Sequence, residues 1–164
     1  MGPQDLVILL KIKAKGEENW RMKDIAYELA ISNSEVSESL NRSVIAGLIA
    51  GDKKRVMKTS LLEFLKYGLK YVYPQRPSAM VRGVATAHSA MPLSEIIQSD
   101  VIYVWPYAEG NERGFSIEPL HANVPKAVLE DNQLYELLAL VDALRLGTAR
   151  EQKLAIQELE NHFQ

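Results

Sequence analysis

The sequence contains no cysteine among its 164 residues. This excludes disulfides, thiol nucleophiles and cysteine-ligated metal sites, and it fits a reducing compartment. No apolar run approaches the ~20 residues of a membrane-spanning helix. The short apolar stretch from Leu6 to Leu10 is flanked by Asp5 and Lys11, and no small-residue cleavage signal follows it. We therefore expect a cytoplasmic protein without an export signal or a membrane anchor.

The sequence also lacks the motifs of common enzyme classes. It has no phosphate-binding glycine loop, no dinucleotide-binding glycine pattern and no glycine pattern around a nucleophilic serine. Two of its three histidines, His88 and His121, would form a two-histidine, one-carboxylate metal site with Glu118. Pro119 prevents Glu118 and His121 from sharing a helical face, so their spacing carries little information. We expect no enzyme activity, no metal and no cofactor.

The net charge of -2 conceals an asymmetry between the two halves of the chain. Residues 1–76 contain 13 Lys and Arg against 9 Asp and Glu, whereas residues 77–164 contain 6 against 12. A basic front half suits a polyanionic partner, and an acidic back half would be repelled by one. Chance segregation of solvated surface charge is the alternative.

The first third of the chain predicts three helices. Apolar residues that follow Pro3 predict a first helix ending at Lys15–Gly16, and a second amphipathic run covers residues 21–30. Ser32 and Glu35 have the spacing of a capping box, so a third helix should begin near Asn33 and end at Gly47. Its inward positions are expected to be Val36, Leu40, Val44 and Ile45.

A basic hairpin is expected after the third helix. Leu48 and Ile49 begin an extended segment, and Gly51–Asp52 suits a hairpin turn. Lys53, Lys54, Arg55 and Lys58 lie on this turn or beside it.

This order of elements resembles the winged helix-turn-helix of MarR-like bacterial transcription regulators. The resemblance covers roughly residues 4–73, which is less than half of the chain. The matching positions are Ala26, Leu29, Ile31, Ser32, Val36, Leu40 and residues 46–49. In such proteins a recognition helix enters the major groove, the wing touches the adjacent DNA backbone, and the protein is usually a dimer.

The resemblance implies a set of DNA-binding residues. Groove-facing positions would be Asn33, Ser34, Ser37, Asn41 and Arg42, and wing contacts to phosphate would come from Lys53, Lys54 and Arg55, with Lys58 beside them. Asn and Arg suit base recognition because they can form paired hydrogen bonds with adenine and guanine, respectively.

Glu38 departs from this pattern because it adds a negative charge to the groove-facing side. It would be tolerated mainly by accepting a hydrogen bond from a cytosine amino group. The alternative is a winged helix that no longer reads DNA and acts as a protein-interaction adaptor, such as an antitoxin-like protein or a complex subunit.

The rest of the chain predicts a smaller α+β module. Ser60 and Glu63 suggest another capping box and a fourth helix reaching Tyr73. Residues 75–99 favour a long connection, and residues 101–107 and 114–120 favour a β-hairpin with edge strands. Asp131 should cap a helix over residues 132–146, and a last helix should open at Thr148.

We therefore expect an α+β, mainly α protein. Residues 1–74 would form the DNA-binding domain, residues 75–99 a connecting segment, and residues 100–164 a C-terminal module of a β-hairpin and a helical hairpin. The expected function is sequence-specific regulation of transcription by a homodimer bound to double-stranded DNA. The C-terminal module would serve dimerisation, a protein partner or a small-molecule effector.

Overall fold

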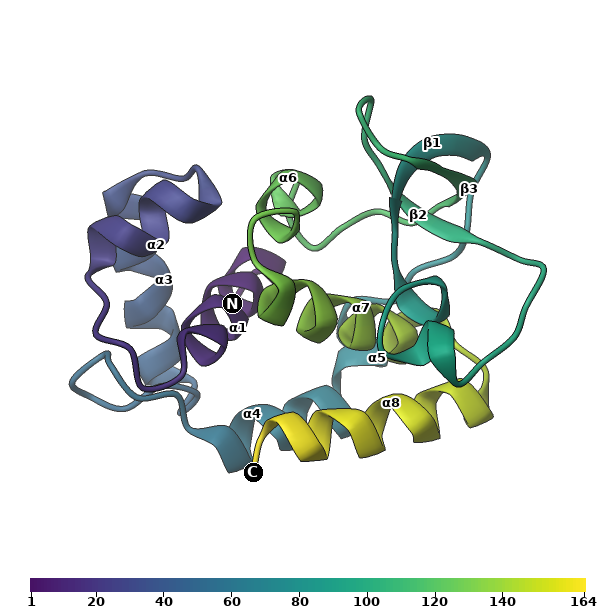
Figure 1. The fold of residues 1–164 in the computed structure, drawn as a ribbon. Coiled ribbons are helices and arrows are strands. Elements are labelled where there is room, and N and C mark those ends of the chain that lie inside the picture. Colours follow the sequence, from purple (N-terminus) through teal and green to yellow (C-terminus); the bar gives the residue numbers. More distant parts are fainter.

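Helix α1 (Pro3–Lys15) lies between helices α2 and α3 on one side and helix α7 on the other in the computed structural model, which describes residues 1–164 (Figure 1). Every residue from Asp5 to Ile12 is buried. A helix that is buried on all sides needs apolar residues all round, which explains the uninterrupted run from Leu6 to Leu10. The run is thus the centre of the core.

Helices α2 (Met22–Leu29) and α3 (Asn33–Ile45) confirm the predicted pair and the predicted break between them. The Ser32 hydroxyl accepts the Glu35 amide at 3.1 Å, and the Glu35 carboxylate accepts the Ser32 amide at 3.1 Å. Val36 and Leu40 are buried as expected. Ile45 is not: its side chain is 87% exposed, because it lies on the same side of α3 as the exposed residues Glu38 and Asn41.

A short hairpin follows α3. Ile49 and Val56 pair in antiparallel fashion, and the Ala50 amide donates to the Arg55 carbonyl at 2.8 Å. Lys53 closes the turn with a positive φ of 62°. The predicted hairpin is therefore confirmed.

The predicted fourth helix is two helices with a different start. Helix α4 (Lys58–Tyr67) begins before the expected Ser60, and Gly68 separates it from α5 (Leu69–Val72). The Ser60–Glu63 capping box is therefore wrong. The hairpin ends at Met57, and the chain enters the helix directly from it.

The segment predicted as a connection contains the first of three strands, each of which pairs with the other two. Strand β1 (Met80–Ala85) is followed by two short 3-10 helices, η1 (Ala87–Ser89) and η2 (Leu93–Glu95). Strands β2 (Tyr103–Pro106) and β3 (Glu112–Ser116) run parallel to each other, and β1 pairs antiparallel with both. The expected antiparallel hairpin of β2 and β3 is therefore wrong.

Glycine allows the three strands to close on one another. Gly83 of β1 pairs with both Pro106 and Glu112. A Cβ at Gly83 would lie 2.0 Å from the Trp105 carbonyl oxygen, and one at Gly110 would lie 2.1 Å from the Gly83 oxygen. Side chains at these two positions would thus collide with the backbone and force the strands apart.

The C-terminal helices begin at the predicted capping residues. After α6 (Val124–Val128), Asp131 caps α7 (Asn132–Leu146) by accepting the Leu134 amide at 3.0 Å. Thr148 and Glu151 form the capping box of α8 (Ala149–His162), which runs beside α4 (Figure 1). The predicted helical hairpin is confirmed.

Both halves of the chain contribute to one core. A single cluster of 37 buried apolar residues includes side chains from α1 to α8 and from the strands. None of the helices combines the length and the apolar character needed to cross a membrane. The residues predicted as two domains therefore share their apolar interior.

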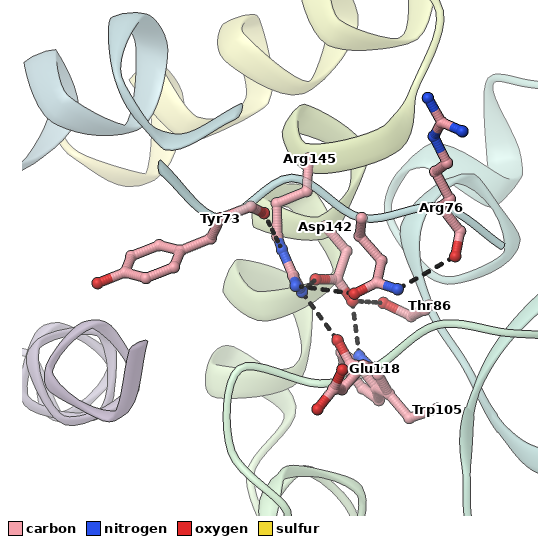
Figure 2. A network of polar contacts seen from close by, with 8 residues as sticks. Tyr73, Arg76, Thr86, Trp105, Glu118, Asp142 and Arg145 are labelled. Carbon is pink, nitrogen blue, oxygen red and sulfur yellow. Dashed lines mark hydrogen bonds and ion pairs between the residues drawn. The ribbon is translucent and has the colours of Figure 1, made fainter. Parts of the chain in front are cut away.

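A buried polar network lies where α7 meets the strands and the end of α5 (Figure 2). One carboxylate oxygen of Asp142 accepts from Thr86 at 2.8 Å and from the Trp105 indole at 2.6 Å, and the other accepts from Arg145 at 2.8 Å. Arg145 also donates to the Tyr73 carbonyl at 3.0 Å. Burial raises the pKa of Asp142, and the three donors oppose that rise by stabilising the carboxylate.

The network predicts strong coupling between Asp142 and Arg145. Asp142→Leu and Arg145→Met should each lower the free energy of unfolding by ~3 to 5 kcal/mol, because each leaves a buried charge without its partner. The double variant should lose clearly less than the sum of the two, since both charges are removed together. Urea denaturation of the three variants measures this, and additive losses would contradict the coupling.

Candidate nucleic-acid interface

Helix α3 presents a stripe of exposed side chains on the face opposite the core. Ser34, Glu38, Asn41 and Ile45 are all exposed, and their spacing places them along one side of the helix. We call these four residues the α3 stripe. Three are small or polar, and none is held by an ion pair. The stripe can therefore approach a flat or grooved partner closely.

The other predicted groove residues differ in their availability. Asn33 is exposed at the first turn of α3, and Ser37 is half-buried at the margin of the stripe. Ile45 was predicted to lie in the core, but it is a surface residue. Its exposure on the α3 stripe suits contact with the methyl group of thymine.

The Arg42 guanidinium is bonded to another side chain of the protein. Its guanidinium makes two hydrogen bonds of 2.9 Å with the carboxylate of Asp5, a fully buried residue of α1. Burial raises the pKa of Asp5, but the hydrogen bonds from Arg42 and the Gly2 amide outweigh it, so the pKa lies below its ordinary value of 3.8. Arg42 could therefore contact guanine only through the guanidinium donors that Asp5 does not use, or after this pair breaks.

The hairpin cations fall into two groups. Lys53 and Arg55 have no carboxylate within 4.0 Å, so their charges are available at the tip. Lys54 instead lies 4.2 Å from the centre of the Trp20 ring and donates to the Trp20 carbonyl at 2.9 Å. Lys54 thus fastens the hairpin to the chain before α2, a role that its place in the basic run did not indicate.

Asp52 is the one carboxylate within the basic turn. It accepts the Lys54 amide at 2.9 Å, and this hydrogen bond lowers the pKa of its carboxyl group. The carboxylate shapes the loop, and its charge offsets part of the positive charge there.

The remaining predicted cation, Lys58, is the first residue of α4 and is exposed. It lies on the far side of the hairpin from the turn, beside a cleft that Lys13 and Arg55 also line. The hairpin therefore lies between the α3 stripe and the basic cleft lined by Lys13, Arg55 and Lys58.

Contacts from the C-terminal half fix α2 and α1 in place. The side-chain amide of Asn123 donates to the carbonyls of Leu29 and Ala30 at 3.1 and 3.0 Å, which satisfies the C-terminal end of α2. Lys11 of α1 is buried and lies 2.6 Å from Asp131, the cap of α7. Residues of both halves of the chain therefore hold the helices that pack against α3.

The histidines considered as metal ligands lie in different surroundings. His88 is buried, with Nε2 2.8 Å from the Val101 carbonyl and Nδ1 3.1 Å from Glu151. His121 Nδ1 accepts the Asn123 amide at 3.0 Å. No group of three potential metal ligands comes together in the structure.

Comparisons of this chain with protein-family models, with curated proteins and with solved structures gave no significant match. The residues of the α3 stripe and the hairpin are therefore the features that indicate a function.

The Asp5–Arg42 pair predicts a pH-dependent stability. Because the pKa of Asp5 is lowered in the fold, the pair contributes fully at neutral pH, and its contribution is lost as the pH falls through the folded pKa. Asp5→Asn should cost about 1 to 3 kcal/mol at neutral pH, and its difference from the parent should shrink in acid. Denaturant unfolding over a range of pH measures this.

Asp24→Asn is the matched control, because Asp24 holds the same position in α2 and accepts the Arg21 amide at 2.8 Å but has no ion pair. It should have a small effect. A loss for Asp5→Asn that stays constant from neutral to acid pH would show that the ion pair is not its cause.

Proposed function

We propose that this protein is a DNA-binding transcription regulator with a winged helix-turn-helix in its N-terminal half. Helix α3 would serve as the recognition helix, and the hairpin over residues 49–56 would serve as the wing. The observation that carries the proposal is the exposed α3 stripe next to a hairpin whose Lys53 and Arg55 have no acidic partner.

The chemistry of these two surfaces matches the two parts of a DNA site. Short polar side chains such as Ser34 and Asn41 let the helix backbone come close to base edges, and Asn can hydrogen-bond adenine at two atoms. Lysine and arginine at the hairpin tip suit phosphate, which supplies affinity without sequence preference. The basic front half of the chain supports the same partner.

We further propose that the regulator acts as a two-fold dimer. Tyr67, Tyr71 and Val72 on α4 and α5 are 66%, 74% and 54% exposed. Aromatic side chains grouped in this way are typical of protein interfaces, and two-fold dimers are the commonest homo-oligomers. A dimer would present two α3 helices to two half-sites of an operator.

A protein-interaction adaptor is the second candidate. The observation that favours it is the exposure of two large apolar side chains on the same helix pair, Tyr27 at 86% and Ile45 at 87%. Glu38, on the same helix as Ile45, would suit a basic protein surface better than phosphate. This function would use Ile45 and Glu38 of the α3 stripe for a different partner.

The DNA-binding proposal makes a prediction about salt. Replacing Lys53 and Arg55 with Ala should weaken binding to all duplexes and reduce the slope of log affinity against log salt by about one unit per lost phosphate contact. Asn41→Ala should weaken the preferred duplex relative to random DNA and leave the slope unchanged. Fluorescence anisotropy with a duplex from upstream of the gene and a random duplex measures both.

Lys153→Ala is the matched control, since Lys153 is an exposed lysine on α8, away from the hairpin. It should leave the affinity and the slope at the parent values. If the parent protein binds neither duplex at low salt, the adaptor becomes the better account. If the parent binds DNA and the hairpin variant keeps the full slope, the hairpin does not contact phosphate and is not the wing.

A further inference from the structure

A basic cleft opens between the C-terminal end of α1, the second arm of the hairpin and the first turn of α4. Its volume is about 640 Å³, and its lining includes Lys13, Arg55 and Lys58. Glu17 is the only acidic residue among those that line it. These cations come from three elements that lie apart in the sequence, so the basic run of the hairpin alone does not indicate the cleft.

The cations of this cleft are not paired with carboxylates, although Glu17 lines the cleft and Lys13 lies 5.4 Å from the centre of the Phe163 ring. Lys13, Arg55 and Lys58 form no ion pair with any carboxylate. Burial and the nearby charge of Lys58 lower the pKa of Lys13. Like charges held together without a partner repel each other, and an anion between them would remove that cost.

The first turn of α4 adds hydrogen-bond donors to the same cleft. Met57 supplies no side-chain cap, and the first turn contains no acidic residue. The amides of Lys58, Thr59 and Ser60 have no acceptor within the protein. Unpaired amides and the positive end of the helix dipole both favour an anion at this place.

We propose that this cleft is a phosphate-binding site, formed by Lys13, Arg55, Lys58 and the amides of the first turn of α4. The volume leaves room for a group larger than one phosphate, such as a phosphodiester segment or a pyrophosphate. Two sources share this chemistry. One is the backbone of the bound DNA beyond the hairpin, which rests on the proposed function, and the other is a soluble phosphorylated compound, which does not.

The primary test is a titration of the ¹⁵N-labelled full chain with inorganic pyrophosphate at constant ionic strength, followed by amide NMR shifts. The amides of residues 58–60 should shift and saturate, whereas sodium chloride at equal ionic strength should not shift them. The double variant Lys13→Gln/Lys58→Gln should weaken this binding at least tenfold. Lys153→Gln, an exposed lysine on α8, should bind like the parent.

Thr59→Glu separates loss of the site from loss of the fold. Thr59 is exposed at the second position of α4, where a carboxylate stabilises a helix through its dipole. The variant should therefore unfold at an equal or higher temperature than the parent, yet bind pyrophosphate at least tenfold more weakly. Gln157→Glu on α8 adds the same charge at a distance from the cleft and should not change binding.

The source of the phosphate is decided with duplex DNA. If the Lys13/Lys58 double variant lowers the salt slope of DNA binding, the DNA backbone occupies the cleft. If it alters pyrophosphate binding only, the ligand is a soluble phosphorylated compound. Saturable pyrophosphate binding by a protein that binds no DNA would overturn the proposed function but leave the site. Absence of saturable shifts at residues 58–60, or unchanged binding by Thr59→Glu, would overturn the site itself.

Discussion

The buried pair of Asp142 and Arg145 is the interaction on which the joint between helices and strands depends. Asp142 receives donors from Thr86 after β1, from Trp105 in β2 and from Arg145 in its own helix, while Arg145 reaches the carbonyls of Tyr73 and Glu118. Hydrogen bonds are directional, whereas apolar contacts are not. The pair therefore positions these five chain segments more specifically than apolar packing would. The pair costs desolvation, and the number of its partners offsets that cost.

A separate set of contacts joins the helices of the proposed DNA-binding face to the C-terminal half. Lys11 ties α1 to the cap of α7, and Asn123 closes the end of α2 from a segment more than ninety residues away. These contacts leave α3 with few ways to move independently of the C-terminal half. Any event that alters the C-terminal half, such as dimerisation or ligand binding, would therefore reach the α3 stripe only through α1 and α2, which contact both.

Local signals in the sequence predicted the helices whose first turns are capped by residues adjacent to them. The capping boxes at Ser32 and Thr148 and the cap at Asp131 are satisfied within three residues, so the sequence alone locates α3, α7 and α8. Strand β1 was not predicted because its partners lie far along the chain, and its closure depends on the missing side chain of Gly83. The parallel arrangement of β2 and β3 was missed for the same reason.

At the candidate site, the sequence predicted which residue types occur, but it could not predict which side chains are free to contact a partner. Lys53 and Arg55 are free, whereas Lys54 and Arg42 are held by Trp20 and Asp5, partners that no spacing rule connects with them. The most direct test of the account is amide NMR mapping of the full chain with a duplex two helical turns long. The account predicts that the largest shifts fall within residues 33–46 and 50–58, with α8 unaffected. Shifts confined to the C-terminal half, or none at low salt, would contradict it.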